Sequence, residues 1–133
     1  MKQFTVKTTS QVAMIDITDR VRIFLKESGI TCGVCHVYVP HTTAAVTINE
    51  NADPDVPRDI IMSLDKLIPL KDHYRHMEGN AAAHIKSSLL GSSQTVFIEN
   101  GALVLGTWQS IFFCEFDGPR ARSFYVKLIP TAA

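Results

Sequence analysis

The sequence lacks a long apolar run and has no excess of charge of either sign. No window approaches the roughly 18 apolar residues that a membrane-spanning helix needs, and the opening residues MKQFTVKTTS contain no apolar segment typical of a signal peptide. We therefore expect a cytoplasmic protein without a membrane partner. The 13 basic and 13 acidic residues give a formal net charge of zero. This balance argues against a nucleic-acid partner, because nucleic-acid-binding surfaces cluster Lys and Arg.

Cysteines are also few. Three are present, an odd number. Cys32 and Cys35 have the C-x-x-C spacing of redox and zinc motifs, but no second pair of matching spacing completes a structural zinc site. Both of them, and Cys114, lie in apolar segments that resemble strands. The sequence therefore favours unbonded cysteines that act as small apolar residues in a sheet.

The length and composition indicate one folded domain over residues 1–133. The chain has 133 residues, of which 46% are hydrophobic, and this size is enough for one hydrophobic core. Apolar and polar residues alternate in QFTVKT and QVAMIDI, which predicts that the chain opens with a β-hairpin. Later strands are predicted over TCGVCHVYV, AAVTI, QTVFIE, ALVL, QSIFFCEF and SFYVKLI. The dipeptides NG (100–101) and DG (117–118) predict hairpin turns between strands.

Three segments have helical spacing. The first is TDRVRIFLKESG, with Thr18 or Asp19 as its expected N-cap and Gly29 as its expected end. The second starts near residue 55 and has one apolar face, and the third is AAAHIKSSLL, with Asn80 as its expected N-cap. The order of strands and helices predicts a single compact α+β domain with a mainly antiparallel sheet and helices packed on it.

Polar side chains that could act on a substrate are concentrated in three segments. The segment 39–59 offers His41, Thr42, Thr43, Asn49 and Glu50. The segment 73–86 offers His76, Glu78, Asn80 and His84. The segment 106–122 offers Trp108, Gln109, Glu115, Arg120 and Arg122. Each segment lies at a strand end or in a loop next to a helix start, so all three are expected to border a cleft.

The histidines suggest a divalent metal ion, zinc or magnesium, as a cofactor. His76, Glu78 and His84 could be brought together by one helical turn, and His41 could add a further nitrogen ligand. The spacing lacks the H-E-x-x-H pattern of known zinc enzymes. The metal therefore remains one interpretation of these residues among others.

The same segments suit a phosphorylated ligand. Asn80 opens a helix whose free N–H groups favour an anion, and Arg120 and Arg122 could make forked contacts with phosphate oxygens. An ordinary turn with solvated charges is the alternative for these arginines. Trp108 could be a core or interface anchor, while Gln109 could face the cleft.

Three blocks resemble the signature segments of the YjbQ family, also called UPF0047 and often labelled secondary thiamine-phosphate synthase. The blocks are VPHTTAAVTINENADPDVPRDI, HMEGNAAAHIKSSLLG and GALVLGTWQSIFFCEFDGPRAR. The resemblance implies an α+β fold, a homotrimer with sites near the subunit boundaries, and weak thiamine-phosphate synthase activity. It also implies a polar site, sometimes with a bound metal or oxyanion, formed by His41, Glu50, His76, Glu78, His84 and Glu115.

The leading hypothesis is a transferase-like enzyme that acts on phosphorylated small molecules. In the thiamine-phosphate reaction, hydroxymethylpyrimidine diphosphate and thiazole phosphate are joined and pyrophosphate is released. The expected catalytic residues are His41, Glu50, His84 and Glu115. The expected substrate-binding residues are Thr42, Thr43, Asn49, Asn80, Trp108, Gln109, Arg120 and Arg122. A non-catalytic metal- or metabolite-binding trimer and a metal-dependent hydrolase are the alternatives.

Overall fold

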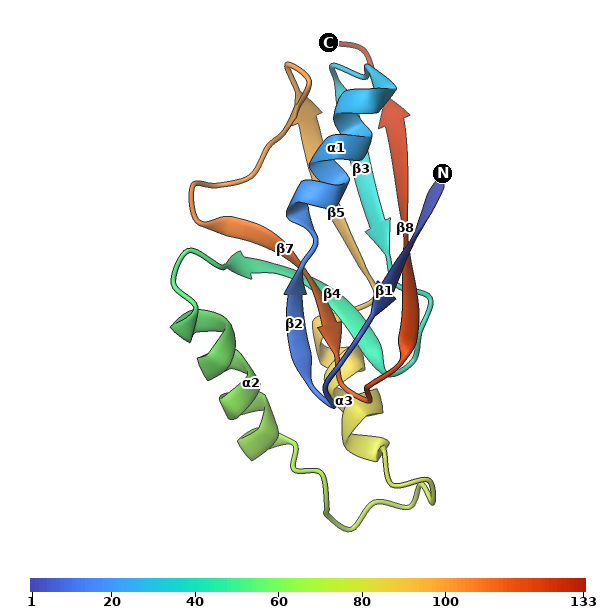
Figure 1. Ribbon diagram of the computed structural model, residues 1–133, viewed down its shortest axis with the longest axis vertical. Coiled ribbons are helices and arrows are strands. Elements are labelled where there is room, and N and C mark those ends of the chain that lie inside the picture. The colour runs from blue at the N-terminus through green and yellow to red at the C-terminus, as the bar shows by residue number, and fades with distance from the viewer.

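The structure is a computed structural model that describes residues 1–133, and Figure 1 shows its arrangement. The first half of the chain contains β1 (Lys2–Lys7), β2 (Ala13–Asp16), α1 (Thr18–Ser28), β3 (Gly33–Tyr38), β4 (Ala44–Glu50) and α2 (Asp55–Leu67). The second half contains α3 (Ala81–Leu90), β5 (Ser93–Glu99), β6 (Ala102–Leu103), β7 (Gln109–Glu115) and β8 (Ala121–Pro130). None of the helices is long and apolar enough to cross a membrane.

The strands form two antiparallel sheets. The larger has the order β1-β8-β3-β5-β6, and the smaller has the order β2-β7-β4. Long strands from the two sheets cross in the middle of the molecule, with α1 lying along one side (Figure 1). The predicted compact α+β domain with mainly antiparallel pairing is confirmed.

The predicted opening hairpin is wrong. β1 pairs with β8, where Phe4 lies opposite Phe124, and β2 pairs with β7, where Ile15 lies opposite Phe113. Residues 8–12 therefore carry the chain from one sheet to the other. The alternation in each strand correctly predicted a half-buried strand, but it carries no information about which strand lies beside it.

The predicted turn at Asp117 and Gly118 is also not a hairpin, since β7 and β8 belong to different sheets. The segment that links β7 to β8 is a second crossing between the sheets. It runs beside the first crossing, residues 8–12, and the Gly118 N–H donates to Gln11 O at 2.9 Å. A Cβ at position 118 would lie 2.2 Å from Ser10 O, so the close approach of the two crossings requires glycine. By contrast, the predicted turn at Asn100 and Gly101 is confirmed, and both residues have positive φ.

The main core lies between the sheets and α1. Phe4 stacks on Phe124 with ring centroids 4.8 Å apart, and Val21 and Leu25 of α1 are buried in the same cluster. The three cysteines are free, as predicted. Cys35 and Cys114 are buried, whereas Cys32 is partly exposed.

Helix ends differ from the predicted caps in two places. α1 ends at Gly29 as predicted, with φ of 71°. At its start neither Thr18 nor Asp19 is the cap. The Thr18 hydroxyl is buried and accepts the Ile111 N–H at 2.8 Å, while Asp16 Oδ1 accepts the Thr18 N–H at 2.9 Å. Asn80 does occupy the N-cap position of α3, but its side chain makes no capping hydrogen bond.

The helices pack unequally on the sheets. α3 is buried against β4 through Ala81, Ala82 and Ala83. α2 has no buried residue, and its apolar face borders an open groove lined by Val56, Asp59, Ile60, Ser63, Leu64 and Leu67. Leu64 nevertheless packs on the cluster that contains Phe112 and Cys114 of β7, so this face packs on the smaller sheet in part, while Leu67 stays exposed. α2 lies at the edge of the molecule (Figure 1).

Candidate functional site

A polar pocket lies where the β3–β4 loop, the start of α3 and the β7–β8 crossing meet. Its volume is about 470 Å³, and none of its lining residues is hydrophobic. We call it the charged pocket. It is lined by Pro40, His41, Thr42, Thr43, His76, Glu78, Asn80, His84, Asp117, Arg120 and Arg122. The structure thus brings together residues from all three polar segments of the sequence.

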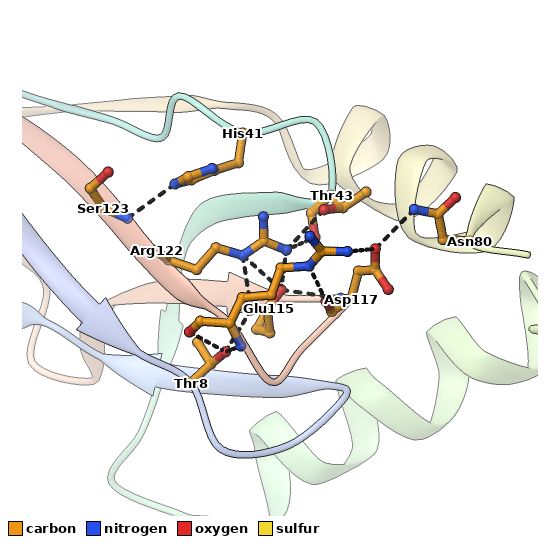
Figure 2. A network of polar contacts seen from close by, with 9 residues as sticks. Thr8, His41, Thr43, Asn80, Glu115, Asp117, Arg122 and Ser123 are labelled. Atoms are coloured by element: carbon orange, nitrogen blue, oxygen red, sulfur yellow. Dashed lines mark hydrogen bonds and ion pairs between the residues drawn. The ribbon is translucent and has the colours of Figure 1, made fainter. Parts of the chain in front are cut away.

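Arg122 forms the base of the charged pocket. It is 6% exposed, and it forms an ion pair with Glu115, which is fully buried. Arg122 Nε donates to Glu115 Oε1 at 2.9 Å, and Arg122 Nη2 donates to Thr43 Oγ1 at 2.8 Å. Nη1 has no partner in the protein, and in Figure 2 it points to the side of the guanidinium where His41 lies. The structure therefore fixes the arginine and leaves one of its nitrogens for a ligand.

Glu115 is held ionised by its neighbours. Burial by itself raises the pKa of this carboxyl, but hydrogen bonds from Arg122, Thr8 and the Asp117 N–H outweigh it, and the pKa lies below the ordinary value of 4.5. Every contact of Glu115 is therefore to the protein. The predicted catalytic role stays a prediction. Within this chain the carboxylate is bonded to Thr8, the Asp117 N–H and Arg122, and it positions Arg122.

Arg120 is fixed at the opposite side of the same crossing. Its Nε donates to Asp117 O at 2.8 Å, and its Nη2 donates to Asp117 Oδ2 at 2.9 Å. Asn80 Nδ2 donates to the same carboxylate oxygen at 2.9 Å, whereas Asn80 Oδ1 is buried and has no partner. Asp117 therefore links the start of α3 to Arg120, and Figure 2 shows its contact with Asn80.

Thr8 links Glu115 to the backbone of Arg120, and no local pattern in the sequence marks it as a site residue. Its hydroxyl donates to Glu115 Oε1 at 2.7 Å and accepts the Arg120 N–H at 2.8 Å. Thr8 and Glu115 are 107 residues apart in the chain. Only the pairing of β1 with β8 brings Thr8 to this position, so no local pattern could have predicted it.

His41 is placed for hydrogen bonding as a neutral imidazole. Its Nε2 accepts the Ser123 N–H at 3.0 Å, so the proton of the neutral ring is on Nδ1. Burial lowers the pKa of His41 below its ordinary value of 6.5, and the positive charges of Arg122 and Arg120 lower it further, against the opposing charge of Glu115. At neutral pH, His41 therefore offers an N–H donor at Nδ1.

The other two histidines face each other across the pocket. The rings of His76 and His84 have centroids 5.1 Å apart and planes at 74°. Glu78 and His41 also line the pocket, but no group of three or more His, Cys, Asp or Glu side chains lies close enough together to hold a metal ion. The predicted ligand set His41, His76, Glu78 and His84 therefore does not fit a metal within one chain.

Four predicted site residues lie away from the charged pocket: Asn49, Glu50, Trp108 and Gln109. Along the β4–β7 pair, Ala44 lies opposite Glu115 at one end and Glu50 lies opposite Gln109 at the other. Six residues of strand separate the ends by roughly 20 Å. The prediction that Glu50 shares a site with His41 is therefore wrong within one chain.

Their contacts are also local. Asn49 Oδ1 accepts the Glu50 N–H at 2.7 Å, and Gln109 Oε1 accepts the Gly106 N–H at 2.8 Å. Trp108 is 64% exposed, so it is not a core residue. Its exposed ring leaves the alternative of an interface anchor open.

Comparison with known proteins identifies the family. A family model described as "UPF0047 protein YjbQ-like" matches residues 2–131. The UPF0047 protein YugU of Bacillus subtilis is 56% identical over 130 residues, covering 97% of this chain and 98% of its own. A UPF0047 protein of Methanocaldococcus jannaschii is 54% identical over 127 residues, covering 96% of this chain and 92% of its own.

Solved structures agree in fold. A YjbQ/UPF0047 family protein of Clostridium acetobutylicum has a TM-score of 0.95 and 55% identity, covering 97% of this chain and 100% of its own. A protein of unknown function from Sulfolobus solfataricus has a TM-score of 0.94 and 34% identity, covering 98% of this chain and 96% of its own. On the strength of nearly full-length matches in both sequence and structure, the chain belongs to the UPF0047, YjbQ-like family.

Proposed function

We propose that the charged pocket binds the phosphate groups of a small molecule, and that the protein is a transferase that joins hydroxymethylpyrimidine diphosphate to thiazole phosphate. One observation carries this proposal. Arg122 is buried and held by Glu115 and Thr43, yet Nη1 remains without a protein partner beside a pocket of polar side chains. A guanidinium that is fixed in advance binds an anion with little loss of side-chain entropy.

Hydrogen-bond donors, more than net charge, support the choice of an anion. Glu115 and Asp117 balance the charges of Arg122 and Arg120, and Glu78 adds a negative charge. The remaining donors that face the pocket are the Nδ1–H of His41, the Thr42 hydroxyl and the rings of His76 and His84. Such an array suits a diphosphate whose charge increases as it leaves.

The reaction makes modest demands on the protein. The thiazole nitrogen attacks the pyrimidine methylene carbon, a C–N bond forms, and the C–O bond to the diphosphate breaks with its electron pair leaving on pyrophosphate. The protein must align the two substrates and stabilise the departing anion. Arg120 and Arg122 would hold the anion, and His84 would donate a hydrogen bond or proton to it.

Two arginines provide a matched test. Arg120 and Arg58 each pair with an aspartate three residues earlier, but only Arg120 lines the charged pocket. We expect Arg120→Gln to weaken pyrophosphate binding, measured by titration calorimetry, by about tenfold, since a charged hydrogen bond is lost. Arg58→Gln should bind as the unaltered protein does. Equal affinity in both variants would contradict the proposal.

Turnover distinguishes the transferase from its alternatives. Formation of thiamine phosphate should be detected with the unaltered protein and should fall in His84→Ala. Binding of pyrophosphate without any turnover would favour a non-catalytic metabolite-binding protein. Release of phosphate or acid from model esters, only when a divalent metal is added, would favour a hydrolase.

We also propose that the chain assembles as a homotrimer. The support is the exposed part of the apolar face of α2, where Leu67 is 73% exposed, and the exposed ring of Trp108. Exposed apolar surfaces of this kind commonly mark protein interfaces. Light scattering should give about three times the chain mass of 14.7 kDa. The mass of a single chain would contradict the assembly.

A further inference from the structure

A second pocket lies next to the charged pocket, at the other side of His41 and His84. Its volume is about 520 Å³. We call it the serine pocket. It is lined by His41, Thr42, Ala44, His84, Ser87, Ser88, Gly91 and Ser92. His41, Thr42 and His84 line both pockets, so they form a wall that the two share.

Two polar side-chain atoms that are closed off from solvent have no hydrogen-bond partner, and both belong to residues that line these pockets. These atoms are Asn80 Oδ1 and Ser87 Oγ. Asn80 lines the charged pocket, and Ser87, which is 8% exposed, lines the serine pocket. A buried polar group without a partner costs about 1–3 kcal/mol, so such groups are rare and usually have a function. A ligand that occupied both pockets would lie beside both of these residues.

The serine pocket differs from the charged pocket in its electrostatics. None of its lining residues is Lys, Arg, Asp or Glu. A charged group placed there would lose its hydration without gaining a counter-ion, which is costly. An uncharged group with hydrogen-bond donors and acceptors would instead match the serine hydroxyls and the neutral imidazole of His41. The chemistry of the serine pocket therefore favours an uncharged group over a second phosphate.

We propose that the two pockets bind the two ends of one ligand, with its phosphate in the charged pocket and an uncharged, hydrogen-bonding ring in the serine pocket. This inference rests on the proposed function, because it assumes that the charged pocket binds phosphate. In the proposed reaction the aminopyrimidine occupies the serine pocket and the diphosphate occupies the charged pocket. The methylene carbon between them then lies beside the shared wall of His41 and His84.

Two probes test the inference by titration calorimetry. They are inorganic phosphate and 4-amino-5-hydroxymethyl-2-methylpyrimidine phosphate. We expect the pyrimidine phosphate to bind at least about tenfold more tightly than phosphate, because the ring adds hydrogen bonds and buried surface. In Ser87→Ala, the affinity for the pyrimidine phosphate should fall by about three- to tenfold, while the affinity for phosphate should be unchanged.

A second pair of variants separates blocking of the serine pocket from a general effect of adding a ring to the surface. Ser88→Phe places a ring in the serine pocket from an exposed position on α3, and Ser28→Phe makes the same change at an exposed position at the end of α1, away from both pockets and from the apolar face of α2. Ser88→Phe should abolish the tenfold advantage of the pyrimidine phosphate and leave phosphate binding unchanged, whereas Ser28→Phe should change neither.

The possible failures are distinguishable. If the unaltered protein binds phosphate but gains nothing from the ring, or if both Ser87→Ala and Ser88→Phe leave the pyrimidine phosphate unaffected, the inference about the serine pocket is wrong and the phosphate site stands. If the unaltered protein binds neither probe, the proposed function itself is wrong.

Discussion

Glu115→Gln tests how the charged pocket is built, because it removes one charge and almost no volume. The oxygens of Glu115 accept hydrogen bonds from the Thr8 hydroxyl, the Asp117 N–H and the Arg122 guanidinium. In the glutamine variant an NH2 group takes the place of one of these oxygens. It then points toward groups that donated hydrogen bonds to that oxygen, and it cannot accept them. Arg122, which is 6% exposed, then has no counter-charge.

The expected cost follows from that burial. Removing one partner of a buried ion pair typically destabilises a protein by about 3–5 kcal/mol, since the other charge stays buried and unpaired. The total stability of a domain is about 5–15 kcal/mol. We therefore expect the urea midpoint to fall sharply and the melting temperature to fall by roughly 10–20 °C. Both should be measured at one protein concentration, because assembly affects apparent stability.

The pH dependence provides a second measurement on the same variant. The pKa of Glu115 is lower in the folded protein than its ordinary value of 4.5. Its stabilisation is therefore complete above about pH 4.5 and is lost as the pH falls through the folded-state pKa. Glu115→Gln should lack this part of the acid transition.

A double variant is the control. In Glu115→Leu with Arg122→Met, both charges are absent, and much of the stability lost in the single variant should return although the phosphate site is destroyed. If Glu115→Gln lowered the free energy of unfolding by less than about 1 kcal/mol, the ion pair would be no stronger than one on the surface, and the expected effect of its burial would be refuted. A double variant that is less stable than the single one would also refute that effect.

Four further predictions concern separate parts of the molecule. The pKa of His41, followed by NMR, should lie below 6.5 without ligand and rise when phosphate binds nearby; a value above 6.5 without ligand would contradict its placement. Lys86→Met removes the ion pair with Asp65 that joins α3 to α2, so amide hydrogen exchange in residues 55–67 should accelerate while exchange in α1 stays the same. Gly101→Ala should cost about 1–2 kcal/mol in urea unfolding, because φ is 75° there. Phosphate binding should survive a chelator, and its loss would support the metal site predicted from the sequence.

Local features of the sequence were sufficient to predict most elements. Period-two alternation located the strands, and the bounds of α3 and the turn at Asn100 and Gly101 follow from residues within a few positions of each other. The resemblance to the YjbQ family also followed from contiguous blocks. These features are encoded locally because backbone preferences and side-chain periods act over a few residues.

Tertiary structure decided which of the polar residues form a site. Glu50 and Glu115 are both acids of the β4–β7 pair, yet the register places one at each end of the strands. The sheet order brings Thr8 to Glu115, and the two chain crossings place Arg120 and Arg122 beside His41. Such contacts depend on strand pairing between distant segments, which alternation alone does not specify. The sequence thus determined the kinds of side chain available for chemistry, and the fold selected those that meet in the pocket.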